Sequence, residues 1–100
     1  MRVRLVRGGL PRPTCNLTVE IALHVFRLDI AWEEYRVAVE YDGEAFHGPE
    51  QFAHDLWRRE LLRSAGWVIF VVRKEDIADP TLVGRVHAAL VERGYVADQA

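Results

Sequence analysis

The sequence predicts an α/β domain in which helices flank a mixed β-sheet, and three observations predict this class. Two β-prone segments, residues 23–32 and 35–42, are separated by an acidic turn at residues 33–34 and therefore predict an antiparallel hairpin. A helix is predicted over residues 50–65, and the continuous apolar run at residues 67–72 is typical of a strand buried on both faces. A helix between two strands of one sheet normally makes a right-handed parallel crossover, so the strand at 67–72 is expected to lie parallel to that at 35–42.

The remaining elements extend this sheet and cover it. Apolar and polar residues alternate over residues 15–21, which predicts a further strand. Pro80 opens a last helix that runs to about Gly94 with an apolar stripe facing inward. Residues 1–9 have the pattern of a helix that ends at a glycine pair. Because this pattern is already under way at Met1, we expect a single domain over residues 1–100 that is truncated at its N-terminus or cut from a longer protein.

Composition excludes several classes of protein. One hundred residues, half of them hydrophobic, suit one small globular domain. No apolar run reaches the ~18 residues that a membrane span needs, so no membrane partner is expected. Cys15 is the only cysteine, which excludes an internal disulfide and a cysteine-based zinc site and favours a cytoplasmic protein.

Charge is unevenly distributed along the chain, although the formal net charge is only −2. The first dozen residues carry four arginines and no acid, and residues 33–55 carry seven acids against Arg36 alone. Residues 58–74 are basic again, with five cationic side chains against Glu60. An acidic centre between basic flanks suits a metal-dependent enzyme that acts on a polyanion, but chance unevenness in a small domain explains the same pattern equally well.

Three carboxylates fall on one face of the predicted hairpin. A turn centred on residues 33–34 places Ile30 opposite Val37, and side chains alternate between the two faces of a strand. Asp29, Glu40 and Asp42 then share one face with Arg27. The other face is uniformly apolar and comprises Leu28, Ile30, Trp32, Val37, Val39 and Tyr41. This apolar pattern fixes the predicted register, because a slip by one residue would mix the two faces.

The shared face predicts a site for a divalent cation. Asp29 and Glu40 become diagonal neighbours, with Cβ atoms roughly 7 Å apart and within reach of one ion. Carboxylate oxygens are the ligands that Mg²⁺ prefers, and Asp42 adds a third, so we expect Mg²⁺ or Mn²⁺ here. The alternative is that Glu40 pairs with Arg27 across the strands and holds no metal.

A series of motifs in fixed order resembles a known family. The motifs are Gly9-Leu10-Pro11-Arg12-Pro13, Phe26-Arg27-Leu28-Asp29-Ile30-Ala31, Val39-Glu40-Tyr41-Asp42-Gly43, His47, Asp55-Leu56-Trp57-Arg58, Leu62 and Gly66-Trp67. Their order and spacing resemble the Vsr-like (very-short-patch-repair-like) endonuclease domain of the PD-(D/E)XK, or restriction-endonuclease-like, superfamily. The resemblance covers roughly residues 5–77.

This resemblance implies a restriction-endonuclease-like sheet and Mg²⁺-dependent hydrolysis of DNA phosphodiester bonds. Asp29 matches the first metal-binding aspartate, Glu40 the second acid, and His47 the histidine that follows the Asp-Gly pair, so these three are the expected catalytic residues. Asp55 and Arg58 match an Asp-x-x-Arg pair on the following helix.

The chain departs from the superfamily pattern at two points. Asp42 stands where the superfamily has a lysine, and the glutamate of the upstream helix is absent. Asp42 either adds a metal ligand or caps the turn at Gly43.

The expected roles follow from the chemistry of hydrolysis. A cation held by Asp29 and Glu40 would lower the pKa of a bound water, and His47 would move a proton. Arg58 and Arg59 would contact phosphate. Alternatives stay open, because His47 also fits an ordinary surface histidine and Arg58 also fits a structural pair with Asp55. His24, His54 and His87 are expected to be structural or exposed, and the three tryptophans to be core or interface anchors.

Three functions remain compatible with the sequence. The first is a metal-dependent DNA endonuclease, a hydrolase acting on phosphodiester bonds. The second is a catalytically silent nucleic-acid-binding module of a regulatory, toxin–antitoxin-type protein. The third is a protein-interaction domain without salt-dependent DNA binding. DNA is the expected partner in the first two, and a homodimer is left open.

Overall fold

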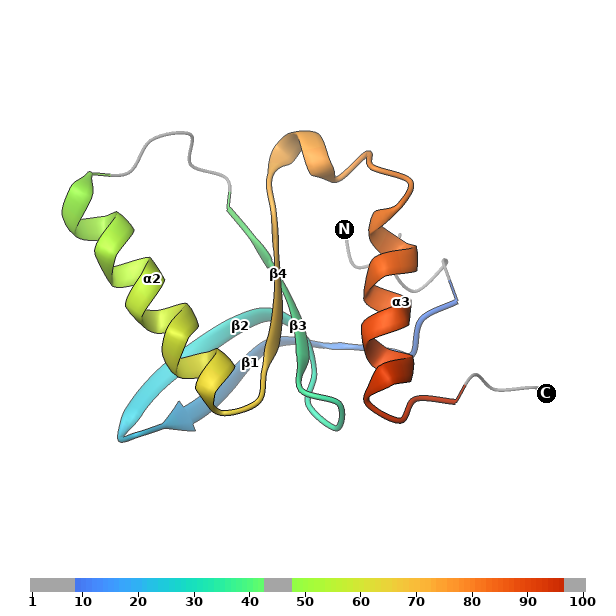
Figure 1. Ribbon diagram of the computed structural model, residues 1–100, viewed down its shortest axis with the longest axis horizontal. Coiled ribbons are helices and arrows are strands. Elements are labelled where there is room, and N and C mark those ends of the chain that lie inside the picture. The colour runs from blue at the N-terminus through green and yellow to red at the C-terminus, as the bar shows by residue number, and fades with distance from the viewer. Residues whose placement is uncertain (1–8, 43–47, 97–100) are drawn as a thin grey trace.

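The computed structural model describes residues 9–42 and 48–96, which form a four-stranded mixed sheet with a helix on either side (Figure 1). The elements in chain order are β1 (Thr14–Ile21), β2 (His24–Trp32), β3 (Val37–Tyr41), α2 (Pro49–Ser64), β4 (Val68–Val72), a 3₁₀ turn (Lys74–Asp76) and α3 (Leu82–Glu92). The predicted α/β class is therefore confirmed. Most of the helix predicted over residues 1–9 lies outside the described residues.

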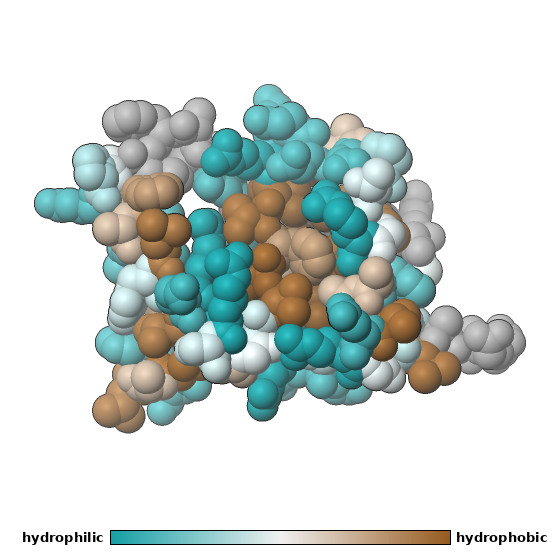
Figure 2. Space-filling model, in the orientation of Figure 1, coloured by the Kyte–Doolittle hydropathy of each residue, from teal (hydrophilic) through white to brown (hydrophobic). Residues whose placement is uncertain are grey.

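The sheet has the order β1-β2-β3-β4. The first three strands pair antiparallel, while β4 pairs parallel to β3 with Val37 beside Val68. Helix α2 makes the connection between β3 and β4, as the sequence predicts. Strand β4 lies at the edge of the sheet, and Figure 2 shows apolar side chains gathered over it between the two helices. No helix in the described part of the chain is long and apolar enough to cross a membrane.

Each helix buries its own core against the sheet. The α3-side core consists of Leu10, Ile30, Trp32, Val37, Val39, Val72, Leu82, Val86, Ala89 and Leu90. The α2-side core consists of Phe26, Leu28, Ala31, Ala38, Leu62, Trp67 and Ile69. Removing these side chains from water is the main favourable term that holds the two helices on the sheet.

The turn between β2 and β3 is longer than predicted. Ile30 lies opposite Val39 rather than Val37, because the chain spends four residues, 33–36, on the turn. Backbone hydrogen bonds close it from Tyr35 to the carbonyl of Trp32, at 3.1 Å, and from Arg36 to the carbonyl of residue 33, at 3.2 Å. Arg36 is left-handed, with φ of 53°, so β3 begins at Val37 and not at residue 35.

The predicted apolar face of the β2–β3 hairpin is confirmed for Ile30, Trp32, Val37 and Val39, which all pack in the α3-side core, and is wrong for Leu28. Leu28 packs in the α2-side core, whereas Ile30 packs in the α3-side core. On β1, Leu17 and Cys15, the partners of these two residues, pack against the same two cores in the same order. Between them Asn16 has a φ of 55°, a left-handed conformation that strands normally avoid. The β1–β2 hairpin therefore twists at the level of Asn16. Leu17 and Leu28 face α2 beyond this level, and Cys15 and Ile30 face α3 before it.

The carboxylate of Asp79 precedes helix α3 and accepts hydrogen bonds from residues at the start of the helix. The backbone N–H and the hydroxyl of Thr81 both donate to Asp79 Oδ1 at 2.8 Å, and Arg85 Nη2 lies 3.2 Å from Oδ2. The Thr81 backbone hydrogen bond, then the Thr81 hydroxyl, and to a smaller extent the Arg85 charge lower the pKa of Asp79 from its ordinary value of 3.8.

We predict that Asp79 stabilises the fold only in its charged form. A carboxyl group with a lowered folded-state pKa contributes stability above its unfolded pKa of 3.8 and loses it as the pH falls through the folded pKa. Urea unfolding of the wild type and Asp79→Asn across this pH range should show a higher midpoint for the wild type at neutral pH. The gap should narrow in acid, and a gap that stays constant would contradict the assignment.

Candidate functional site

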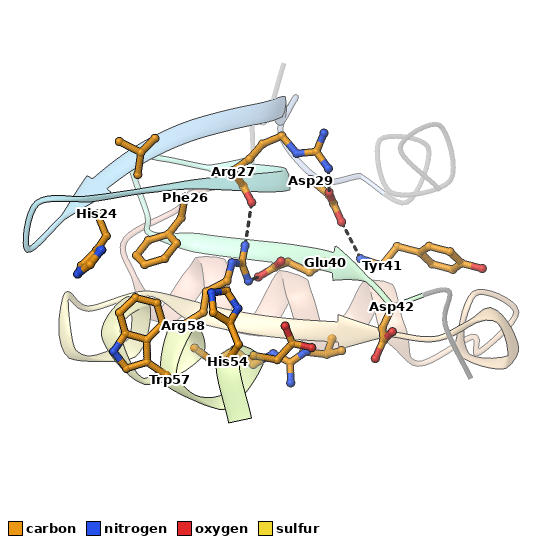
Figure 3. Close-up of a pocket in the computed structure, with 14 residues that line it drawn as sticks. His24, Phe26, Arg27, Asp29, Glu40, Tyr41, Asp42, His54, Trp57 and Arg58 are labelled. Atoms are coloured by element: carbon orange, nitrogen blue, oxygen red, sulfur yellow. Dashed lines mark hydrogen bonds and ion pairs between the residues drawn. The ribbon is translucent and has the colours of Figure 1, made fainter. Parts of the chain in front are cut away.

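A cleft of about 600 Å³ lies between β2, the end of β3 and helix α2 (Figure 3). Five of the six site residues predicted from the sequence line it: Asp29, Glu40, Asp42, Arg58 and Arg59. The sixth, His47, lies outside the described residues. Residues from a strand hairpin and from the following helix thus meet in one cavity, and their contacts determine what that cavity can do.

Arg58 is the central side chain of this cleft. Its Nη1 donates to Glu40 Oε1 at 2.8 Å, and the two side chains are only 16% and 13% exposed. Its Nη2 donates to the backbone carbonyl of Arg27 at 2.8 Å. Its Cζ lies 5.8 Å from the centre of the Phe26 ring, which adds a cation–π contact. Arg58 thereby links α2 to β2 and β3 simultaneously.

These contacts decide between the pairings that the sequence left open. The ion-pair partner of Glu40 is Arg58 on helix α2, and not Arg27, the alternative partner that the sequence offered. Asp55 lies one helical turn before Arg58 but accepts a hydrogen bond from Gln51 at 3.1 Å. Arg58 therefore anchors the helix to the sheet and does not act as a phosphate ligand in this conformation.

Asp29 occupies a structural position at the point where β2 and β3 separate. Cross-strand pairing between these two strands ends at Ile30 and Val39. Beyond this point the backbone N–H of Tyr41 donates to Asp29 Oδ2 at 2.9 Å, so the side chain replaces a backbone acceptor. Asp29 Oδ1 also lies 3.6 Å from Arg27 Nη2, a pair in which the arginine side chain is 68% exposed. An exposed pair of this kind contributes little to stability.

The described carboxylates do not fit a divalent cation as they are arranged. Their oxygens have the right chemistry, but within residues 9–42 and 48–96 no three His, Cys, Asp or Glu side chains are placed to hold a metal. The charge of Glu40 is neutralised by Arg58, and one oxygen of Asp29 is used by Tyr41. The backbone N–H of Asp42 extends the pairing of β3 with β4 by donating to the Val72 carbonyl at 2.8 Å.

An aromatic group at one end of the cleft was not predicted from the sequence. Trp57 lies with its ring centre 4.9 Å from that of His24, 5.9 Å from that of Phe26 and 5.5 Å from that of His54. Figure 3 shows His24, Phe26 and Trp57 at the end of the cleft opposite to Asp29 and Asp42. We call the group of His24, Phe26, His54 and Trp57 the aromatic end. Residues on β2 and α2 form it together, so no local periodicity could have revealed it.

Two further arginines line the cleft. Arg27 exposes most of its side chain, and Arg59 buries its Nε, for which the described residues supply no hydrogen-bond acceptor. A buried donor without an acceptor costs about 1–3 kcal/mol, which an ordered water can offset.

We predict that Arg58 contributes to stability through its buried ion pair. Arg58→Met strands a shielded carboxylate and should lower the free energy of unfolding in urea by about 2–3 kcal/mol. Arg85→Met is the matched control, because the Arg85–Asp79 pair is exposed and should contribute less than about 1 kcal/mol. The double variant Glu40→Leu/Arg58→Met should recover most of the loss. Equal costs for the two single variants would contradict this role.

Comparison with known proteins gives limited additional information. No protein-family model matches the chain, and no solved structure matches it. Two curated proteins of Mycobacterium tuberculosis are similar to it: Uncharacterized protein Rv2248 of strain ATCC 25618 / H37Rv and Uncharacterized protein MT2308 of strain CDC 1551 / Oshkosh. Each is 32% identical over 80 residues, which is 76% of this chain, and the chain spans 29% of the length of each.

Proposed function

We propose that this chain is a nucleic-acid-binding module of endonuclease-like architecture whose carboxylates stabilise the fold. The observation that carries the proposal is the composition of one cleft, which combines the aromatic end with the cations of Arg27 and Arg59. Nucleic acids present phosphate charges and flat bases, and proteins bind them with arginines and aromatic side chains in a shared groove. A regulatory protein of toxin–antitoxin type is a setting that would use such a module.

The distribution of cations within the cleft supports this proposal. Arg58 is already engaged by Glu40, by the Arg27 carbonyl and by the Phe26 ring. The cationic contacts to phosphate are therefore assigned to the exposed guanidinium of Arg27 and to Arg59, which lines the same cleft. Guanidinium groups form strong hydrogen bonds with phosphate oxygens.

The contacts of Glu40 favour a silent module over a hydrolase. In a metal-dependent nuclease a divalent cation would neutralise this carboxylate, whereas here the guanidinium of Arg58 does so at 2.8 Å. Displacing Arg58 from Glu40 would leave the charge of the Arg58 guanidinium unpaired and shielded from water. It would also break the hydrogen bond from Arg58 to the Arg27 carbonyl.

A second candidate function, the Mg²⁺-dependent DNA endonuclease, is favoured by a separate observation. Asp29, Glu40 and Asp42 all line the cleft that would receive the nucleic acid. Loading a metal there would require Arg58 to release Glu40 and Asp29 to change its bonds. His47 would be the further catalytic group under this candidate.

We predict salt-dependent binding of DNA that depends on Arg59. Fluorescence anisotropy with a labelled oligonucleotide should show affinity falling steeply between about 50 and about 200 mM salt. Arg59→Ala should weaken binding and reduce the slope of log K against log salt by about 1. Arg63→Ala is the matched control, an exposed arginine on the same helix outside the cleft, and should change affinity little. Absence of any salt-dependent binding would favour the protein-interaction domain instead.

We further predict that supercoiled plasmid stays intact with Mg²⁺ or Mn²⁺. The expected result is the same for the wild type and for Asp29→Asn/Glu40→Gln, because the proposal gives these side chains structural roles. The amide replacements keep acceptors for Tyr41 and Arg58, and circular dichroism checks that the variant folds. Nicking by the wild type that is lost in the variant would overturn the silent module and establish the endonuclease.

A further inference from the structure

We infer that the aromatic end of the cleft is a stacking site for one unpaired base, so that the module binds single-stranded nucleic acid in preference to duplex. This inference rests on the proposed function and deepens it by specifying the substrate class. Trp57 contacts the rings of His24, Phe26 and His54 and keeps 40% of its surface exposed.

The exposure of Trp57 separates it from the other tryptophans of the chain. Trp32 and Trp67 are 4% and 6% exposed and belong to the two cores. Trp57 instead stands over Phe26, which is 6% exposed and anchors the group in the α2-side core. Trp57 is thus the only one of the three tryptophans that presents a large part of its ring to a ligand. The group is therefore buried at Phe26 and exposed to solvent at Trp57.

The ring geometry leaves a parallel stack unmade. Trp57 meets His24 at an interplanar angle of 87°, Phe26 at 70° and His54 at 50°. None of these three contacts is a face-to-face stack, which is the contact that a nucleobase makes with an aromatic side chain. Base–aromatic stacking tolerates every base, because each base presents a π-face.

The surroundings of the aromatic end suit a base whose strand enters from that side. Asp29 and Asp42 lie at the opposite end of the cleft, where they would repel phosphate (Figure 3). Arg58 Cζ lies 5.8 Å from the centre of the Phe26 ring, Arg59 lines the same cleft, and Arg27 pairs with Asp29. Because Arg58 is already engaged by Glu40, Arg59 is the cation on α2 that is assigned to the phosphate of a base stacked at the aromatic end.

The size of the cleft argues for a single unpaired nucleotide. About 600 Å³ falls within the range of pockets that enclose a group of small-molecule size. Within a duplex both faces of a base are covered by its neighbours, so the base cannot stack on a protein side chain without leaving the helix. Single strands expose these faces without that unstacking cost.

Anisotropy titrations at one low salt concentration would test the inference with a single-stranded DNA, an RNA of the same sequence and the DNA duplex. The wild type should bind the single strands at least about tenfold more tightly than the duplex, because the bases of a duplex have no free face that can stack on Trp57. Comparing the single-stranded DNA with the RNA shows whether the sugar affects affinity. If the base stacks on Trp57, both single strands should bind more tightly than the duplex.

Substitution of the ring supplies the second measurement. Trp57→Ala should weaken single-strand binding about 5- to 150-fold and leave duplex binding nearly unchanged. Trp57→Phe should restore most of the affinity, because it keeps an aromatic ring. Phe52→Ala is the matched control, since Phe52 is a 59% exposed aromatic residue on the same helix outside the cleft, and it should have little effect.

A direct optical readout keeps the inference testable if Trp57→Ala does not fold. Saturating single strand should quench the tryptophan emission of the wild type more than that of Trp57→Phe, whose remaining tryptophans are buried. Duplex bound as tightly as single strand, or equal quenching in both proteins, would overturn the stacking site while the proposed function stands. Failure of all three nucleic acids to bind would overturn the proposed function itself.

Discussion

The three contacts of Arg58 are the constraint on which the cleft depends. One guanidinium joins α2 to β3 through Glu40, to β2 through the Arg27 carbonyl, and to the α2-side core through Phe26. These bonds lie where β2 and β3 stop pairing, so they bridge strands that the backbone ladder no longer holds together. The same bonds neutralise Glu40, a carboxylate of the cleft that is only 13% exposed. The architecture of the site and its chemistry thus follow from a single side chain.

The cleft exists because the hairpin twists. The left-handed backbone at Asn16 and the side-chain bond from Asp29 to Tyr41 lie at the same level, where the hairpin passes from the α3-side core to the α2-side core. A flat β1–β2 hairpin would have kept its apolar side on one core, and β2 would have continued its hydrogen bonds with β3. The separation of the strands instead opens a cavity, and α2 supplies its second wall. Carboxylates that a sequence pattern assigns to a cation are therefore used to hold this separation in place.

The two ends of the cleft have different chemistry, and this difference guides the functional proposal. One end carries Asp29 and Asp42, while the other carries the rings, with the Arg58 guanidinium beside Phe26 (Figure 3). Only the second end combines groups that bind anionic, flat ligands without a metal. The acidic end gives the endonuclease candidate its support, and it would need a rearrangement of Arg58 before it could hold a cation. The proposed module accounts for both ends without such a rearrangement.

The sequence by itself determined the order of the elements, the α/β class, the parallel crossover through α2 and the set of predicted residues that line one cleft. These features follow from local periodicity and from rules of chain connection, which a sequence carries explicitly. Only the tertiary structure decided that Glu40 pairs with Arg58, that the turn takes four residues, that Leu28 and Ile30 serve different cores and that Trp57 meets His24. Each depends on residues far apart in the chain or on a left-handed residue such as Asn16 or Arg36, and local periodicity does not encode either.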